Sequence, residues 1–221
     1  MKTAIILGAT GLTGSILLKN LLQNANYKSV TVFNRRSVGF QNPKLEEHII
    51  DLFELEKYSE IFKADEVYCC VGSTKAKTPD EEIYKKVDYG IPLSAAKLCK
   101  KNNIPKLLIV SALGADPDSR FFYNRIKGEM ERDVLAQKPE GTYLFEPSLI
   151  GGEREEKRFF EAAWKKFMKL GNHLLIGPLK KYRSIHPENI AKAMIWVADH
   201  GYSENQIESD EIKQIAEKAE K

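Results

Sequence analysis

Cysteine, histidine and long apolar runs are scarce in this sequence. It has three cysteines and four histidines in 221 residues, and Cys69, Cys70 and Cys99 lack the spacing of a metal-binding motif. The first two fall in a predicted strand and the third in a predicted helix, so we expect buried thiols in a reducing, cytoplasmic setting. No apolar run is long enough to span a bilayer. We therefore predict no metal site and no membrane association.

The net charge is also small. The 34 basic and 31 acidic residues are interleaved and leave a formal charge of +3, which gives no reason to expect nucleic acid as a partner. The apolar residues near the N-terminus run into a glycine-rich turn with no small-x-small cleavage pattern after it, so we interpret them as a strand and not as a signal peptide. Strand and helix patterns alternate without a linker, which predicts one α/β domain over residues 1–221.

A glycine-rich turn follows the first apolar run. Residues 4–7 predict a strand, Gly8, Gly11 and Gly14 recur every third position, and residues 12–23 predict an amphipathic helix. Bare glycines let the backbone close on a pyrophosphate, which the free N–H groups and dipole of the helix attract. No lysine marks a Walker A loop. A βα turn that binds no ligand is the alternative.

The end of the second predicted strand favours NADP over NAD. The strand covers residues 29–33 and is followed by Asn34, Arg35 and Arg36. A dinucleotide fold has an acid for the adenosine ribose about 20 residues after its last glycine, and Asn34 stands there instead. Without that negative charge, the two guanidinium groups can bind a 2′-phosphate. They could also be ordinary solvated side chains.

Further strands are predicted at residues 47–52, 66–71, 106–111 and 141–148, with a helix at 80–103 bent at Pro92. Ligands of an open α/β sheet bind at the carboxyl ends of its strands. The residues that we expect to contact the cofactor are therefore Gly8, Thr10, Gly11, Leu12, Thr13, Gly14, Asn34, Arg35, Arg36, Asp51, Leu52, Val71, Gly72, Ser73, Thr74 and Pro147.

Small substrate-side elements are expected at about residues 148–185. Within them the polar segment 151–158 is a candidate lid and residues 159–170 predict a helix. A further helix is expected from about Pro187, and a charged surface helix over residues 210–221. The segment between Pro147 and Pro187 leaves little room for a large substrate lobe.

A tyrosine and a lysine are placed to form a catalytic site with a serine. Tyr123 and Lys127 share one face of a predicted helix. About one pair of this spacing is expected by chance in such a composition, so the motif alone proves nothing. The position of the motif favours a catalytic role, because it follows the fifth predicted strand, whose carboxyl end carries Ser111. We predict these three side chains to be catalytic.

With these motifs the sequence resembles the atypical, NAD(P)H-binding members of the short-chain dehydrogenase/reductase superfamily, and among them the Tat-interactive oxidoreductase-like group. The segments that carry the resemblance are 6–14, 34–36, 69–74, 111–116 and 123–129. It implies a Rossmann-like, doubly wound, mostly parallel sheet with helices on both faces, and a nicotinamide cofactor. It also implies a Ser–Tyr–Lys site in which Tyr123 is the acid/base, Lys127 contacts the ribose and Ser111 contacts the carbonyl. Two departures are Ala112, where many relatives have a second hydroxyl, and Glu146, where the group suggests arginine.

We therefore predict an NADP(H)-dependent oxidoreductase that transfers hydride between nicotinamide and a small carbonyl or alcohol substrate. The Lys127 ammonium and the positive nicotinamide ring are expected to lower the pKa of Tyr123 from its usual value of about 10. One alternative is a redox-sensing interaction protein that binds NADPH without turnover. The other is a nucleotide-sugar epimerase-like enzyme, which normally retains NAD and needs a larger substrate lobe. The chain is expected to be a monomer or a homodimer.

Overall fold

Seven parallel strands form one sheet in the computed structural model, which describes residues 1–137, 141–150 and 181–219. Their spatial order is β3 (Leu45–Ile49), β2 (Tyr27–Asn34), β1 (Lys2–Leu7), β4 (Glu66–Cys69), β5 (Lys106–Val110), β6 (Gly141–Glu146) and β7 (Gln206–Glu208). Every neighbouring pair is parallel. The chain winds outward from β1 in one direction through β2 and β3, then crosses to β4 and winds in the other. This reversal beside β1 is the switch point at which doubly wound folds bind ligands.

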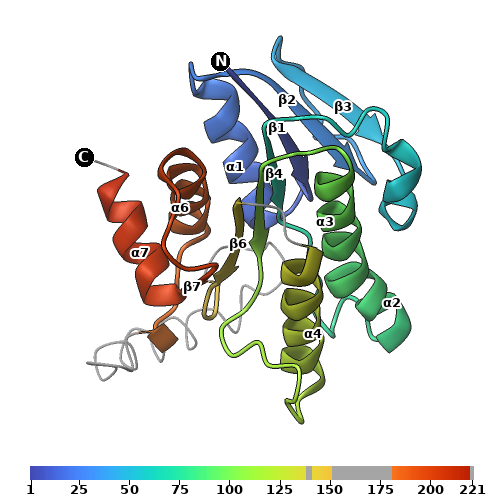
Figure 1. Ribbon diagram of the computed structural model, residues 1–221, viewed down its shortest axis with the longest axis vertical. Coiled ribbons are helices and arrows are strands. Elements are labelled where there is room, and N and C mark those ends of the chain that lie inside the picture. Colours follow the sequence, from blue (N-terminus) through green and yellow to red (C-terminus); the bar gives the residue numbers. More distant parts are fainter. Residues whose placement is uncertain (138–140, 151–180, 220–221) are drawn as a thin grey trace, which may run out of the picture.

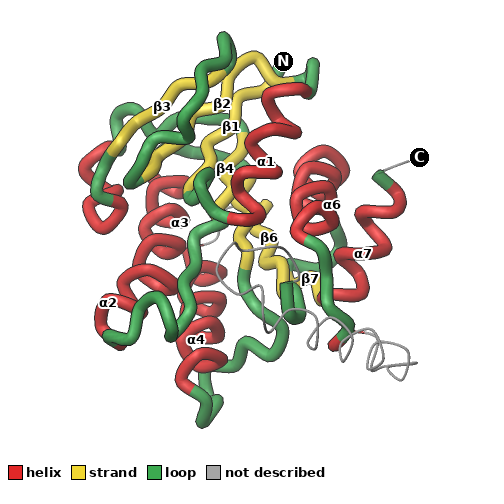
Figure 2. Tube along the Cα trace, turned by 180° about the vertical axis from the view of Figure 1, so that it is seen from behind, coloured by secondary structure: helices red, strands yellow, loops and turns green. Residues whose placement is uncertain are grey.

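Helices cover both faces of the sheet, as the front and back views show (Figures 1 and 2). One face carries α1 (Leu12–Gln23) and α6 (Pro187–His200), and α7 (Ser209–Lys218) packs beside α6. The other face carries α3 (Ile91–Lys101) and α4 (Phe122–Gln137). The shorter elements are the 3-10 helix η1 (Leu52–Tyr58), the helix α2 (Glu81–Lys85) and the π-helical turn η2 (Lys86–Gly90). The Rossmann-like, doubly wound architecture expected from the sequence is confirmed.

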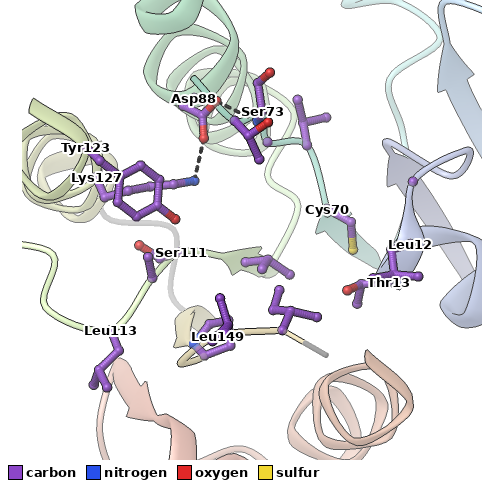
Figure 3. A pocket seen from close by; sticks show the side chains of 18 of the residues that line it. Leu12, Thr13, Cys70, Ser73, Asp88, Ser111, Leu113, Tyr123, Lys127 and Leu149 are labelled. Atoms are coloured by element: carbon purple, nitrogen blue, oxygen red, sulfur yellow. Dashed lines mark hydrogen bonds and ion pairs between the residues drawn. The ribbon is translucent and has the colours of Figure 1, made fainter. Parts of the chain in front are cut away.

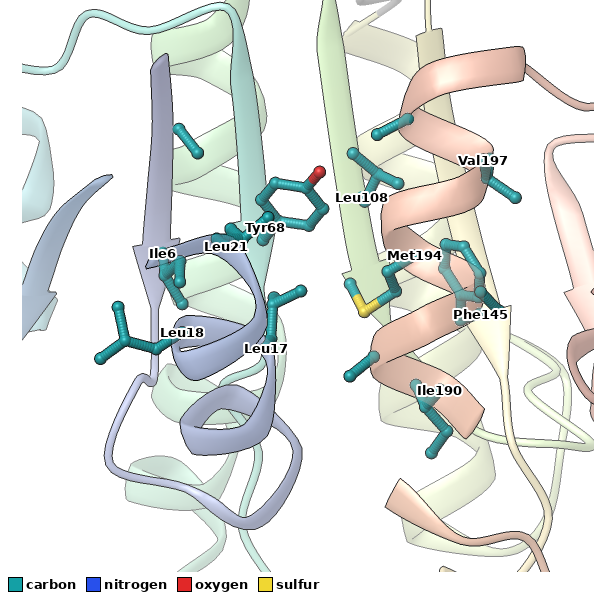
Figure 4. Packing of buried hydrophobic residues seen from close by; sticks show 14 of the residues in the cluster. Ile6, Leu17, Leu18, Leu21, Tyr68, Leu108, Phe145, Ile190, Met194 and Val197 are labelled. Atoms are coloured by element: carbon teal, nitrogen blue, oxygen red, sulfur yellow. The ribbon is translucent and has the colours of Figure 1, made fainter. Parts of the chain in front are cut away.

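Strand periodicity divides the core between the two faces. In β1, Ile6 faces α1 and α6, where it packs in one cluster with Leu18 and Met194 (Figure 4). Its neighbours Ile5 and Leu7 belong to the opposite cluster, which includes α3 and α4. All three strand residues are fully buried, and burial of each such side chain contributes about 1.5–3 kcal/mol. Because the central strands pack against apolar cores on both faces, their carboxyl ends hold the residues of a site in defined positions.

Three elements differ from the sequence expectation. Strand β3 ends at Ile49 and not at residue 52, because the residues that follow form the turn into η1. The short strand β7 was not predicted, because three residues between polar loops give no periodic signal. The long helix is interrupted at η2, before Pro92 and not at it. Proline has no N–H for the carbonyl four residues earlier, that of Asp88, and its ring would clash with that carbonyl in a regular helix. The π turn is wider than an α-helical turn, and it places Asp88 where the clash between its carbonyl and the ring of Pro92 is relieved.

The remaining expectations concern thiols, membranes and the substrate side. All three thiols are free, and Cys69 and Cys99 are buried as expected. Cys70 is only half-buried, because it lies at the cleft wall. Within the described ranges no helix combines the length and the apolar character needed to cross a bilayer. The candidate lid at 151–158 and the helix expected at 159–170 lie outside the described residues. On either side of them, Ile150 and Ile185 form a parallel bridge.

Candidate functional site

A cleft of about 990 Å³ opens at the carboxyl ends of β1, β4, β5 and β6, at the switch point (Figure 3). It brings together the predicted catalytic residues Ser111, Tyr123 and Lys127 with part of the predicted cofactor set. From that set the lining includes Gly11, Leu12, Thr13, Val71, Gly72, Ser73, Thr74 and Pro147. Segments from five parts of the chain therefore converge where the sequence predicted one site.

The turn between β1 and α1 leaves no room for a side chain at Gly8 or Gly14. Gly8 has a φ of +84°, and a Cβ there would lie 2.9 Å from the carbonyl oxygen of Cys70. A Cβ on Gly14 would lie 2.2 Å from the carbonyl oxygen of Gly8, so α1 begins in direct backbone contact with the turn. Gly11 is the N-cap of α1, with no side-chain cap and no acidic residue in the first turn. The first-turn N–H groups are thus available to an anion in the cleft, which fits a pyrophosphate.

Asn34 fixes this turn from the end of β2. Its side chain is buried, and its Oδ1 accepts a hydrogen bond from the Ala9 N–H at 3.2 Å. Its Nδ2 is a buried donor with no partner among the described residues. Arg35 and Arg36 follow on the exposed surface. The structure therefore places an unused donor and two cations beside the turn, consistent with the adenosine side of a dinucleotide.

Other predicted cofactor residues lie outside the cleft lining. Asp51 caps η1, accepting the N–H of Phe53 at 2.9 Å. Leu52 is buried in the core cluster that contains Phe33. Because both side chains have these structural roles, the adenine contact predicted for them finds no support in the cleft. Thr10 is exposed on the turn.

The predicted catalytic trio comes from the end of β5 and from α4. Ser111 directly follows β5, and its N–H donates to the Phe145 carbonyl at 2.7 Å, which extends the pairing with β6. Its hydroxyl is buried at the cleft wall. The ring of Tyr123 is 42 % exposed, and its hydroxyl points into the cleft toward Ser111 (Figure 3). Lys127 lies one helical turn later and is almost fully buried. Two hydroxyls can thus approach one substrate oxygen.

Asp88 completes the site, and sequence reasoning missed it. Its Oδ1 lies 2.9 Å from the Nζ of Lys127, and both side chains are buried. Its Oδ2 accepts the backbone N–H of Ser73 at 2.8 Å, and both interactions are visible as dashed lines in Figure 3. The π turn η2 carries this carboxylate to the cleft. A carboxylate amid the apolar positions of the 80–103 helix was the signal that could have found it.

The charges set the protonation states of Tyr123 and Lys127. Burial raises the pKa of Tyr123, and the Asp88 carboxylate adds to this, while the Lys127 ammonium lowers it in part. The pKa therefore lies above the usual value of a phenol, because burial together with Asp88 outweighs the lysine. The lysine acts in the direction expected from the sequence, and the expected effect of the nicotinamide ring stays a prediction. Burial lowers the pKa of Lys127, but the charge of Asp88 and its hydrogen bond to the ammonium contribute to raising it overall. At neutral pH the site holds a phenol that can donate a proton beside a charged ammonium.

The loop after Ser111 is held by Asn124, within the tyrosine–lysine motif, and by Gly128, which directly follows it. The Nδ2 of Asn124 donates to the Gly114 carbonyl at 2.6 Å, and its own carbonyl accepts the N–H of Asp116 at 3.0 Å. A Cβ on Gly128 would lie 2.2 Å from the carbonyl carbon of Asp116. The loop therefore rests directly on α4, which fixes the distance between Ser111 and the tyrosine. Sequence reasoning assigned no role to either residue.

The two departures from the family pattern lie close to this trio. Ala112 is buried in the cleft wall. Glu146, at the end of β6, is buried, and burial together with Glu131 and Glu208 raises its pKa to about 8. Burial also raises the pKa of Glu131, while the hydrogen bond that the Gln206 amide donates to its Oε2 at 2.9 Å lowers it in part. An acidic cluster thus stands where the family resemblance suggested a cation.

A family model described as the NAD dependent epimerase/dehydratase family matches residues 4–209. The chain belongs to this family. The match spans the glycine turn, the catalytic trio and Asp88, so nicotinamide dinucleotide is the cofactor class of the fold that surrounds this cleft. The short-chain dehydrogenase/reductase character expected from the motifs is confirmed.

The relatives of this family member include proteins from animals and fungi. Protein HTATIP2 of Rattus norvegicus is 32 % identical over 170 residues, which cover 75 % of this chain and 70 % of the relative. Protein FMP52, mitochondrial, of Meyerozyma guilliermondii is 35 % identical over 205 residues, covering 88 % and 84 %. This fungal relative and that of Candida albicans are named mitochondrial. The cytoplasmic location expected from the sequence is contradicted by these relatives.

Solved structures share the fold at low identity. A UDP-N-acetylglucosamine 4-epimerase from Methanobrevibacter ruminantium M1 superposes with a TM-score of 0.68 at 19 % identity, covering 96 % of this chain and 80 % of that one. WbmH of Bordetella bronchiseptica in complex with NAD+ has a TM-score of 0.69 at 14 % identity, covering 98 % and 80 %. These likenesses agree with the sheet order described above.

Proposed function

We propose that the protein is an NADP(H)-dependent oxidoreductase that interconverts a small carbonyl compound and its alcohol. The observation that carries the proposal is the arrangement of Tyr123, a neutral phenol, beside Ser111 and the charged Lys127 in the cleft that begins at the glycine turn. This trio has a proton donor, a hydroxyl to orient an oxygen and a fixed positive charge, which are the groups that carbonyl reduction requires.

The residues of the cleft fit a nicotinamide dinucleotide. The bare turn and the first N–H groups of α1 would hold the diphosphate, and Arg35 and Arg36 would hold a 2′-phosphate. Lys127 would contact the nicotinamide ribose, with Val71 to Thr74 and Pro147 along the cleft. When bound, the reduced cofactor supplies a hydride to the carbonyl carbon. Carbonyl, NADPH and one proton thereby give alcohol and NADP+.

The protein residues then handle the proton. Tyr123 donates its phenolic proton to the carbonyl oxygen while the hydroxyl of Ser111 orients that oxygen. The Lys127 ammonium stabilises the phenolate that remains until solvent reprotonates it. Asp88 keeps Lys127 charged and in place through its 2.9 Å contact. Asp88 is therefore a positioning residue, because it acts through the lysine.

Tyr123→Phe tests the proposal. Loss of the proton donor is expected to abolish carbonyl reduction, measured as loss of NADPH absorbance, while calorimetry finds NADPH affinity nearly unchanged. Tyr58→Phe removes a hydroxyl from a half-buried ring outside the cleft and is expected to leave both unchanged. A fully active Tyr123→Phe variant would refute the assignment. Tight NADPH binding by the wild-type protein without turnover of any carbonyl would favour a redox-sensing role instead.

An epimerase-like activity is the second candidate. The match to the NAD dependent epimerase/dehydratase family and the superposition on a UDP-N-acetylglucosamine 4-epimerase favour it. An enzyme of this kind would retain NAD through each turnover and convert a nucleotide sugar with no net change in cofactor absorbance. Mass spectrometry of the native protein distinguishes the two candidates by the dinucleotide that co-purifies.

A further inference from the structure

A second, smaller cavity adjoins the catalytic cleft beside Tyr123. It has a volume of about 240 Å³ and is lined by Ser73, Thr74, Lys75, Tyr84, Phe122 and Tyr123. Ser73, Thr74 and Tyr123 line both the cavity and the cleft, so a molecule whose reacting oxygen meets the Tyr123 hydroxyl can extend into the cavity. The cavity therefore has the position of a substrate subsite.

Aromatic carbon forms much of the cavity wall. The rings of Tyr84 and Phe122 meet edge to face, with centroids 5.6 Å apart and an interplanar angle of 65°. Lys75 places its Nζ 4.5 Å from the Phe122 ring centroid, and its charge is balanced by Glu81 at 2.6 Å. The wall thus offers ring edges and faces without an unbalanced charge, which favours an uncharged, flat group.

The polar groups of the wall are largely engaged within the protein. The Ser73 hydroxyl bonds that of Thr78 at 2.6 Å, and the Ser73 N–H donates to Asp88. The Tyr84 hydroxyl donates to the Ser73 carbonyl at 3.3 Å. Few of these groups could pair with a sugar hydroxyl, and a sugar placed here would lose hydrogen bonds to water without replacing them.

The volume suits a single ring. An apolar cavity of about 150 Å³ is sufficient to hold benzene, whereas pockets for drug-sized ligands begin at about 300 Å³. From the volume, the aromatic wall and the engaged polar groups we infer that this cavity is a subsite for an aromatic ring attached to the reacting carbonyl. The inference rests on the proposed oxidoreductase function and names its substrate class: aromatic aldehydes and ketones, with the corresponding benzylic alcohols.

Two adjacent phenylalanines provide a matched pair of variants. Phe122 lines the cavity, whereas Phe121 is 75 % exposed and does not. With NADPH, the wild-type protein is expected to reduce benzaldehyde with a higher kcat/KM than butanal. Phe122→Leu should lower the benzaldehyde to butanal ratio about three- to tenfold, the loss typical of one aromatic contact. Phe121→Leu should leave the ratio unchanged. Equal ratios in all three proteins would overturn the subsite.

A binding measurement separates this inference from the proposed function. Saturation-transfer NMR with benzyl alcohol, without turnover, should show contact of its ring protons with the wild-type protein and a weaker signal in Phe122→Leu. If this pattern is seen but neither aldehyde is reduced, the subsite stands and the oxidoreductase proposal fails. If the wild-type protein reduces butanal but shows no benzyl alcohol contact, the subsite is refuted and the oxidoreductase stands.

Discussion

The Nζ of Lys127 lies 2.9 Å from the Oδ1 of Asp88, and both side chains are removed from solvent. The two residues come from different helices, α4 and the π turn η2, which meet at the cleft wall. In a medium of low polarity such a pair is strongly coupled, so the lysine cannot be considered as an isolated positive charge. The effect of Lys127 on the neighbouring phenol therefore depends on Asp88.

Asp88→Asn is expected to lower the pKa of Tyr123. The carboxylate is one of the causes that raise this pKa, and its removal leaves burial alone to oppose the effect of the Lys127 ammonium on the phenol. Oxidation of an alcohol requires the phenolate of Tyr123. In the Asp88→Asn variant, the rising limb of the pH–rate profile for alcohol oxidation should therefore move to lower pH. Loss of one partner from a buried pair should also cost about 3 kcal/mol of unfolding free energy.

The control for this variant is Asp118→Asn, on the exposed loop between β5 and α4. It removes the same charge at a distance from the lysine and should leave the pH profile and the stability unchanged. An Asp88→Asn enzyme that folds and keeps the wild-type pH limb would show that Asp88 does not tune the tyrosine.

Asn34→Asp and the removal of Arg35 and Arg36 should move cofactor preference toward NAD. A carboxylate at residue 34 can keep the contact with the Ala9 N–H, since that contact uses an oxygen. Its negative charge would repel a 2′-phosphate and accept from a ribose hydroxyl. Loss of the arginines should weaken NADPH binding about tenfold to a hundredfold, the range for charge-assisted hydrogen bonds.

Calorimetry with NADPH and NADH measures this shift. NADH affinity should be unchanged in an Arg35→Ala, Arg36→Ala double variant, because NADH has no 2′-phosphate. Equal losses for both cofactors would show instead that the arginines stabilise the turn. Unchanged affinity for both would show them to be solvated surface charges.

Much of this site could be anticipated from the sequence because its signals are local. The glycines at 8, 11 and 14 and the pair Tyr123 and Lys127 each occupy one short segment, and parallel strands bring their ends together. The position of Asp88 among apolar residues could have marked it as unusual, but its contact with Lys127 could not be predicted, because it depends on a π turn and on a lysine from another helix. The effect of burial on the pKa of Tyr123 could not be predicted either, because it depends on the packing around α4. Leu52 was assigned to the cleft because the end of β3 was placed too late.

Gly14→Ala should destabilise the fold and remove cofactor binding together. The new Cβ would lie 2.2 Å from the Gly8 carbonyl oxygen, and backbone cannot move aside as a side chain can. Overpacking of this kind costs about 1–3 kcal/mol. The matched control is Gly90→Ala, whose Cβ would meet no atom closer than 3.9 Å. Urea unfolding should show the difference, and equal stability of the two variants would contradict the close approach of α1 to the turn.

Glu146 should make the protein less stable as pH rises. Its pKa is raised to about 8 by burial and by Glu131 and Glu208, whereas in the unfolded chain it is about 4.3. Between these values the folded state binds more protons than the unfolded state, so unfolding free energy falls with increasing pH and levels off above about 8. Glu146→Gln removes this titration. Each pKa unit corresponds to about 1.4 kcal/mol, and each kcal/mol shifts the Tm of a chain this size by about 2–4 °C.

Thermal unfolding of the wild-type protein and of Glu146→Gln from pH 5.5 to 9 isolates this group, because all other titrations are shared. The Tm of the wild-type protein should fall by several degrees relative to the variant across this range, with most of the change below pH 8. Glu82→Gln, at an exposed position of α2, should follow the wild-type curve. Parallel curves for the wild-type protein and Glu146→Gln would mean that the Glu146 carboxyl is ionised throughout this pH range. The acidic cluster at the ends of β6 and β7 would then be stabilised by cations such as Lys181, whose Nζ lies 2.9 Å from Glu208.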